Sequence, residues 1–296
     1  MGRPSAGEGR REDGRDGGRR LGARVAGADK PQYLRGGRHH GSDLRRGREN
    51  HAFYVQTQFN WKDQAFLTPG IRFEDNQAYG KASIPRLSGG FFLPWTNTKL
   101  RGTWAKGITE PSFTQTFGSG ATVGNPDLRP ERVETWEGGF DQYLLDNAAE
   151  INVTYFNNKY QDLIASVPPT NLNIQSAESS GIETAVQGRL NWPLDLKTTL
   201  TLSHTYLETK ALADGGVGGT TFPPGQPLLR RPKHRGAVTV DVAGKRFSVN
   251  VNATVQGRSI DRDFSRAGSP RVDLPAFIKA DLAGSVVVLN GRPEDR

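Results

Sequence analysis

The sequence predicts an all-β fold, in which strands build the wall of a large antiparallel transmembrane β-barrel behind a disordered N-terminal tail. Apolar and polar residues alternate with a period of two along most of the chain after residue 50. The connections between these segments alternate between short and long. The longest aliphatic run is only Val286 to Leu289, which excludes a membrane-spanning helix but not membrane-spanning strands.

The strands are recognised by apolar residues that share a face. In 246–256, every second position is apolar and opposes polar neighbours, as at Phe247, Val249 and Val251. Clear alternation marks five segments, at 51–61, 149–158, 181–190, 196–206 and 246–256. Weaker alternation marks six more, at 65–74, 81–93, 98–106, 133–144, 235–243 and 276–288. We therefore expect about eleven strands, many about ten residues long, and no amphipathic helix.

The lengths of the connections alternate along the chain. Short connections are expected at 62–64, 94–97, 145–148, 191–195 and 244–245. Long ones are expected at 107–132, 161–180, 209–234 and 258–275, with 75–80 a modest member of that group. An outer-membrane barrel has tight turns at one end and extended loops at the other. A soluble β-sandwich has no reason to sort its turns in this way.

The five tryptophans map near the ends of the expected strands. Three lie at or beside short turns, namely Trp61, Trp95 and Trp192. Trp104 and Trp136 lie within a few residues of the longest loop. Aromatic girdles at the two membrane interfaces would place tryptophans in this way, although strand-end aromatics also brace turns in other β proteins.

The basic character of the chain belongs to its first 50 residues. The net charge is +8, and residues 1–50 carry +6 of it, from 13 Lys and Arg against seven Asp and Glu. This Arg/Gly-rich segment cannot form a core and has no apolar stretch typical of a signal peptide. One interpretation is a nucleic-acid-binding arm, but a single aromatic, Tyr33, offers little base stacking. The favoured interpretation is a mistranslated start, so no nucleic-acid partner is expected.

Two stretches at the longest expected loop share an unusual density of Pro, Asn and Asp. They read LRGTWAKGITEPSFTQTFG (100–118) and GNPDLRPERVETWEGGF (124–140). Prolines fix φ and remove amide donors, while Asn and Asp side chains bond to their own backbone, so a rigid turn is expected. Ion pairs of Glu131 with Arg129 or Arg132 are also expected, each weak if exposed.

These stretches resemble the TonB-dependent outer-membrane receptors. The first stretch matches the family motif at Gly107, Pro111, Ser112 and Phe113. The second matches it at Asn125, Pro126, Asp127, Leu128, Pro130 and Glu131. Further similar segments follow in the family order, VTYFNNKYQDLIA (153–165), NIQSAESSGIE (173–183) and RRPKHRGAV (230–238). The resemblance implies a structural loop at the barrel rim rather than a ligand site at these positions.

The resemblance also implies function and location. The family takes up metal chelates such as ferric siderophores or cobalamin across the outer membrane, driven by the TonB complex. Barrels of this class have 22 strands around a plug, so this chain is expected to supply about eleven of them. We expect a tail at 1–50, a partial barrel at 51–289 and an aberrant or truncated end at 290–296. Without plug and closing strands, the fragment is expected to be inactive alone, with TonB engaged only by the full-length receptor.

The sequence has no pattern typical of a catalytic, metal-binding or cofactor-binding site. The chain has no cysteine, no Ser/His/Asp arrangement and no His cluster at ligand spacing, so no enzyme, metal site or cofactor is expected. Ligand contacts should come from the long loops, where the candidates are Thr114, Gln115, Phe117, Asn171, Asn173, Phe222 and Arg266. Two alternatives stay open, a passive porin-like outer-membrane channel and a soluble β-rich binding protein.

Overall fold

The computed structural model describes residues 32–33, 47–120, 122–167, 169–214, 224–263, 265–266 and 270–288. Most of the expected tail and the whole of 290–296 lie outside these residues. Two short strands from the tail are described, β1 (Gln32–Tyr33) and β2 (Gly47–Arg48), which pair with each other. No helix in the described part combines the length and apolar character that a membrane crossing requires.

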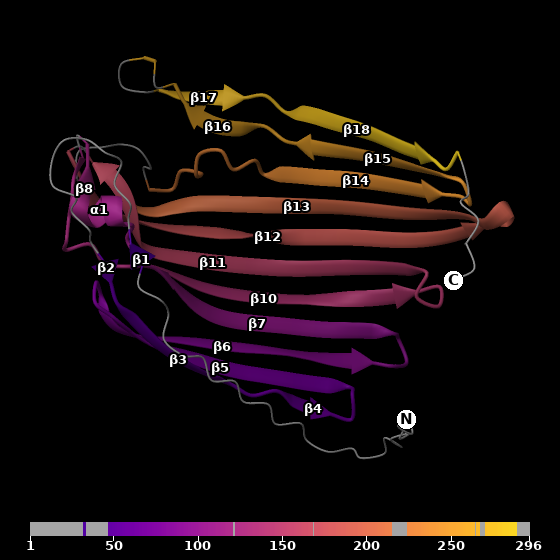
Figure 1. The fold of residues 1–296 in the computed structure, drawn as a ribbon, viewed down its shortest axis with the longest axis horizontal. Helices are drawn as coiled ribbons and strands as arrows, with labels where there is room; N and C mark the ends of the chain where they lie inside the picture. The colour runs from indigo at the N-terminus through magenta and orange to yellow at the C-terminus, as the bar shows by residue number, and fades with distance from the viewer. Residues whose placement is uncertain are drawn as a thin grey trace, which may run out of the picture.

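One antiparallel sheet of 12 strands dominates the molecule (Figure 1). Its order is β18-β15-β14-β13-β12-β11-β10-β7-β6-β5-β3, with β4 also on β5, so each strand pairs with its neighbours along the chain. The first six strands are β3 (Asn50–Gln56), β4 (Phe59–Trp61), β5 (Ala65–Asn76), β6 (Gly80–Leu93), β7 (Thr98–Thr109) and β10 (Glu131–Leu144). The other six are β11 (Ala149–Val167), β12 (Thr170–Trp192), β13 (Leu196–Asp214), β14 (His234–Ala243), β15 (Phe247–Gln256) and β18 (Phe277–Val286).

All eleven expected strands are present, and 51–61 is divided into β3 and β4. Both halves pair with β5 in one continuous register, from Gln56 opposite Gly70 to Phe59 opposite Leu67. Pro69 of β5 lies between these pairs and has no amide hydrogen to donate, so the ladder is interrupted there. Thr57 still donates to the Pro69 carbonyl at 3.0 Å.

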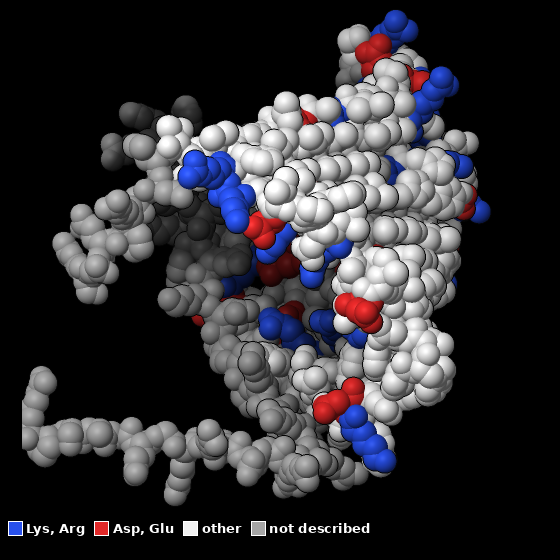
Figure 2. Space-filling view, turned by 90° about the vertical axis from the view of Figure 1, so that its right-hand side faces the viewer, with Lys and Arg blue, Asp and Glu red and all other residues white. Residues whose placement is uncertain are grey.

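The sheet curls so that its two faces differ in polarity. Figure 2 shows a hollow whose wall carries Lys, Arg, Asp and Glu, while much of the outer wall is formed by other residues. The residues that are buried and polar include Asp141 and Thr154, both on the hollow side and bonded to Arg101. On the outer face, Phe140, Val238 and Val251 are 38–40% exposed. Among the described residues only three hydrophobic ones are buried, so the wall is built for an apolar surrounding.

The connections after β7, β13 and β15 are long and share one end of the sheet, as expected, but β5 and β6 are joined at that end by only 77–79. The turns that follow β4, β6, β10, β12 and β14 all lie at the end shown on the right in Figure 1. The opposite end carries the α-helix α1 (Phe113–Phe117). A 3-10 helix, η1 (Pro193–Asp195), lies in one of the turns at the short-turn end. It also carries two small hairpins, β8 (Gly118–Ser119) with β9 (Thr122–Val123), and β16 (Ser259–Arg262) with β17 (Arg271–Leu274).

The prediction of a long loop at 161–180 is wrong, because strands occupy most of this segment. β11 runs to Val167 and β12 starts at Thr170, so only 168–169 connect them. β13 likewise runs to Asp214, inside the loop expected at 209–234. Beyond the apolar belt both faces of a strand meet water, so the period-two contrast fades while backbone pairing continues.

The tryptophans differ in their positions along the strands. Trp61, Trp95 and Trp192 lie at the short-turn end, as expected. Trp104 and Trp136 lie in mid-strand as register partners, so their expected place at strand ends is wrong. The six positions from Thr98, where β7 begins, to Trp104 span roughly 20 Å along the strand, or about 15 Å in height at a barrel tilt. Trp95 lies in the turn that precedes β7, and β7 and β10 both continue beyond the Trp104–Trp136 pair.

Candidate functional site at the loop end of the sheet

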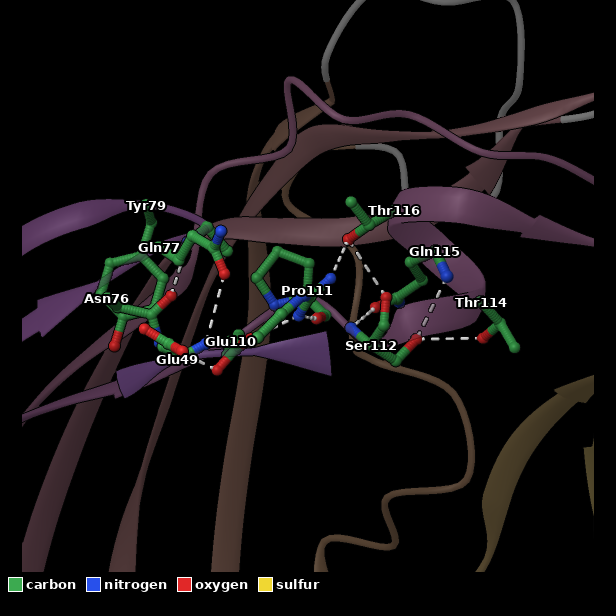
Figure 3. A network of polar contacts seen from close by, with 12 residues as sticks. Glu49, Asn76, Gln77, Tyr79, Glu110, Pro111, Ser112, Thr114, Gln115 and Thr116 are labelled. Atoms are coloured by element: carbon green, nitrogen blue, oxygen red, sulfur yellow. Dashed lines mark hydrogen bonds and ion pairs between the residues drawn. The ribbon is translucent and has the colours of Figure 1, made fainter. Parts of the chain in front are cut away.

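The Pro-Ser-Phe segment forms a short capped helix at the rim. Ser112 is the N-cap of α1, and its hydroxyl accepts from the Gln115 amide at 3.3 Å. The Gln115 side chain returns the contact by accepting from the Ser112 amide at 2.8 Å (Figure 3). This capping box explains why a segment expected to be loop turns into a helix. Its signal, Ser followed three residues later by Gln, is visible in the sequence.

A buried arginine from the expected tail holds this helix. Arg48 is 8% exposed. Its guanidinium donates to the Glu110 carboxylate, the Pro111 carbonyl and the Thr116 hydroxyl. It also lies over the rings of two α1 residues, 4.6 Å from the centroid of Phe113 and 5.5 Å from that of Phe117. Charged hydrogen bonds and ring contacts of one side chain therefore fix the segment that follows β7.

The carboxylate of Glu110, just before α1, also contacts the end of β5 (Figure 3). Glu110 accepts from the Asn76 amide at 3.0 Å, and Asn76 is 1% exposed at the end of β5. Next to it, the Tyr79 hydroxyl donates to Glu74, which also bonds to Arg72. Burial, and then the bond to Glu74, raises the pKa of the Tyr79 phenol, so it stays a donor through the neutral range.

We expect Arg48→Ala to loosen α1 by about 2 kcal/mol, because it leaves Glu110 and a carbonyl without their cation. The figure lies below that for a fully buried pair, since the Glu110 side chain is 31% exposed. Hydrogen exchange of the amides in 112–118 measures the effect. Arg266→Ala is the control, since its pair with Asp263 is 3.0 Å long but Arg266 is 73% exposed. Unchanged exchange in Arg48→Ala would contradict this role.

The Asn-Pro-Asp-Leu motif packs against α1 and against the tall β11–β12 hairpin. Asn125 donates from its backbone to the Gln115 carbonyl at 2.9 Å and from its side chain to the Asn171 carbonyl at 2.8 Å. Its side-chain oxygen accepts from the Asp127 amide at 3.0 Å, which closes the expected turn. Leu128 is 5% exposed and is one of the three buried hydrophobic residues in the described part.

The end of the motif is fixed by one asparagine. The Asn173 side chain accepts from the Arg129 amide at 2.7 Å and donates to the Arg129 carbonyl at 2.9 Å and the Asp162 carbonyl at 2.6 Å. Arg129 forms an ion pair with Asp162 at 2.6 Å. The expected ion pairs of Glu131 with arginine are wrong, because Glu131 accepts from the Ile164 amide at 2.8 Å instead.

We expect Asn173→Asp to weaken the motif loop by about 1 kcal/mol or more, because a carboxylate replaces the amide that donates to two carbonyls. Hydrogen exchange in 125–131 reports this change. The matched control is Asn191→Asp, which introduces the same charge at an exposed position near the other end of β12. Equal protection of the loop in both variants would show that the Asn173 contacts contribute nothing.

The candidate ligand residues fall into separate groups. Thr114, Gln115 and Phe117 lie together on α1, and Phe117 is 39% exposed. Asn171 is buried and Asn173 is occupied by the motif loop, so both have structural contacts. Arg266 lies apart, beside the β16–β17 hairpin, and Phe222 lies outside the described residues. Sequence reasoning missed Arg48, Asn76 and Tyr79.

The β16–β17 hairpin is tied to the segment that precedes β14. Arg230 donates from its backbone to the Ile260 carbonyl at 2.7 Å and from its side chain to the Asp261 carboxylate at 2.9 Å. This hydrogen bond from Arg230 lowers the pKa of the Asp261 carboxyl, which therefore stays ionised at neutral pH. The hairpin thus lies at the same end of the sheet as α1, among the connections of that end (Figure 1).

The chain is similar to known outer-membrane proteins. The family model "TonB dependent receptor-like, beta-barrel" matches residues 10–289. The iron-regulated outer membrane virulence protein of Vibrio cholerae is 27% identical over 207 residues, which are 62% of this chain and 30% of that protein. The vitamin B12 transporter BtuB of Vibrio cholerae is 23% identical over 242 residues, 81% of this chain and 36% of that protein. The chain therefore spans about a third of the length of these curated relatives.

Solved structures show the same fold. The siderophore receptor PirA of Acinetobacter baumannii has a TM-score of 0.61 at 20% identity, covering 82% of this chain and 40% of that one. A mutant of the ferric enterobactin receptor PfeA of Pseudomonas aeruginosa has a TM-score of 0.64 at 19% identity, covering 84% and 38%. The sheet thus has the fold of part of these larger barrels.

Proposed function

This chain belongs to the TonB-dependent receptor-like β-barrel family, and on that premise we propose that it forms part of a receptor for the active uptake of a metal chelate. The family is one of outer-membrane transporters and not of enzymes. The ligand class we propose is a ferric siderophore or cobalamin, the classes in the names of its relatives. Energy would come from the TonB complex, acting on the complete receptor.

The observation that carries this proposal is the anchoring of α1 at the mouth of the hollow. Its supports, Glu110 and Arg48, connect it to Asn76 on the hollow-facing side of β5. A passive channel does not need a helix that is anchored in this way. A receptor gains affinity when its contact groups are held in place before the ligand binds. We propose that Thr114, Gln115 and Phe117 offer hydroxyl, amide and ring contacts to the chelate there.

The wall itself needs partners on both sides. Among the described residues, β3 and β18 each pair along one edge only. Unpaired backbone groups are costly in lipid, so we propose that further strands close the barrel at these two edges.

The test is uptake in a Gram-negative host that lacks its own siderophore and cobalamin receptors. The reading frame is expressed with its flanking DNA, in matched strains with and without functional TonB. Accumulation of iron-55 from ferric catecholates or hydroxamates, and of cobalt-57 cyanocobalamin, is measured. We expect accumulation of one chelate that disappears without TonB and falls when Phe117 is replaced by Ala.

The other outcomes separate the alternatives. Equal accumulation with and without TonB would indicate a passive channel. Recovery of the protein in the soluble fraction, with none in the outer membrane, would indicate a soluble binding protein. Either result would overturn the proposal.

A further inference from the structure

Two histidine rings meet on the outer face of the wall. The Nε2 atom of His204 in β13 and the Nδ1 atom of His234 in β14 are 3.2 Å apart, and the ring centroids are 5.4 Å apart. Both side chains are exposed. Side chains alternate along a strand, so His204 shares the outer face with Leu202, and His234 shares it with Val238. We call His204 and His234 the histidine pair.

Strand register brings the histidine pair together. His204 is opposite Gly236, while His234 is opposite Tyr206, so the two histidines are diagonal neighbours. Gly236 has no side chain, which leaves room beside His204 for the ring of His234. The backbone of His234 is held as well, because its carbonyl accepts from the Gly257 amide at 2.8 Å. The fold therefore places two imidazoles side by side on adjacent strands.

The histidine pair lies at the level of the aromatic residues of the wall. The Tyr206 ring lies 5.2 Å from that of His234. Tyr206 is the register partner of Ile182, and Ile182 is in turn the partner of Tyr155, whose ring lies 5.1 Å from that of Trp136. Aromatic residues of a barrel lie at the level of the lipid headgroups. Water and dissolved ions therefore reach the histidine pair.

The spacing of the two nitrogens fits a shared metal ion. Imidazole nitrogens bind Zn²⁺ at roughly 2.0–2.1 Å, so two of them on one tetrahedral ion lie about 3.3 Å apart. The observed separation is 3.2 Å. At this distance one ring nitrogen donates a proton to the other, and a metal ion can replace a proton shared in this way. The side-chain torsion that turns a histidine ring is soft, so two exposed rings can aim their lone pairs at one point.

The ligand set indicates the kind of metal ion. The described part of the chain has no group of three or more His, Asp or Glu side chains placed to hold a metal ion, so the protein offers two ligands here. Glu208, further along β13, accepts from the Tyr206 hydroxyl. Two imidazoles suit divalent transition metals, among which Cu²⁺ binds most tightly, whereas Mg²⁺ and Ca²⁺ prefer oxygen ligands. Water completes the coordination of an ion held in this way.

We infer that the histidine pair binds one divalent transition-metal ion, most tightly Cu²⁺, through Nε2 of His204 and Nδ1 of His234. The ion joins β13 to the first residue of β14 at the headgroup level. Because the two rings are already adjacent, little ordering is needed when the ion binds. The site faces away from the hollow, so it is separate from the path of a transported chelate, and it depends on neither the chelate nor TonB.

The test measures the Cu²⁺ affinity of the full chain, refolded in neutral detergent micelles, by calorimetry against glycine as a competing chelator. Every protein tested carries His39→Gln and His40→Gln, because this adjacent pair offers the ion a second two-imidazole site. We expect one Cu²⁺ per chain. His204→Gln and His234→Gln should each weaken binding by at least roughly tenfold, because even an outer partner of a metal ligand is worth that much. The matched control is His51→Gln, at an exposed position of β3, where no loss of affinity is expected.

Two further measurements on the chain with both rings intact decide the question if a variant fails to fold. Two imidazoles must both lose their protons to bind, so at acid pH the affinity should fall by up to about 100-fold per pH unit, against about tenfold for one imidazole. The electron paramagnetic resonance spectrum of bound Cu²⁺ should show splitting from two nitrogens.

Three outcomes would overturn the site. They are equal affinity of the histidine-pair variants and the His51→Gln control, a pH dependence of one proton, and splitting from a single nitrogen. Each would indicate that the rings share only a hydrogen bond. Chelate uptake enters none of these measurements, so failure here leaves the proposed function unaffected.

Discussion

Gly181→Ala is expected to destabilise the sheet by about 3 kcal/mol, at the upper end of the cost of overpacking. Gly181 lies in β12 between Phe156 of β11 and Leu207 of β13. A Cβ atom there would lie 2.0 Å from the Tyr206 carbonyl oxygen and 2.9 Å from the Phe156 ring. The nearest atom belongs to the backbone of a paired strand, so the sheet itself has to shift.

The matched control lies on the same strand. Around Gly188 nothing lies within 4 Å of a Cβ atom, so Gly188→Ala should be neutral or slightly stabilising, since alanine loses less chain entropy on folding. The measurement is the urea midpoint of unfolding in detergent micelles, followed by far-UV circular dichroism. Identical midpoints for the two variants would show that the close approach at Gly181 is relieved at no cost.

Val238→Arg is expected to cost about 3 kcal/mol for the membrane-inserted state, because a charge at the middle of the apolar belt faces lipid tails. Val238 is the fifth of the ten residues of β14 and is 38% exposed on the outer face. Its register partners are Leu202 and Ala253, which offer no partner for a cation.

The adjacent position supplies the control. Thr239 faces the hollow, where its hydroxyl accepts from Asn252 at 3.4 Å, so Thr239→Arg places the same side chain in a polar space. Partitioning into lipid vesicles, measured by flotation, should fall for Val238→Arg and remain near wild type for Thr239→Arg. If both variants insert equally well, the assignment of the two faces is wrong.

The strands could be predicted because each crosses the apolar belt. There the contrast between the two faces is strong, so positions such as Val249 and Val251 stand out in the sequence. The same contrast disappears above the belt, which is why the upper parts of β11 and β12 read as loop. The small helix α1 escaped prediction because five residues are too few for a helical period, although its capping pair was visible.

The candidate site was only partly predictable. The motif residues identified the rim loop, and their roles as turn formers agree with the contacts of Asn125. Arg48 could not be found, because its segment has the composition of a disordered tail and its partners lie more than 60 residues away. The pairing of His204 with His234, 3.2 Å apart across β13 and β14, depends in the same way on strand register, which spacing along the chain does not reveal.

The unequal strand lengths carry the end of the β11–β12 hairpin far beyond the tryptophan pair. From Tyr155, whose ring contacts Trp136 at 5.1 Å, β11 continues for twelve residues to Val167, roughly 40 Å along the strand. Its partner β12 has 23 residues, whereas β14 and β15, further along the sheet, have ten residues each. At the end of this hairpin the Pro169 carbonyl accepts from the Val123 amide of β9 at 2.7 Å, so the β8–β9 hairpin lies beside it. An antibody raised against the end of this hairpin would therefore bind at the loop end of the barrel, clear of the apolar belt.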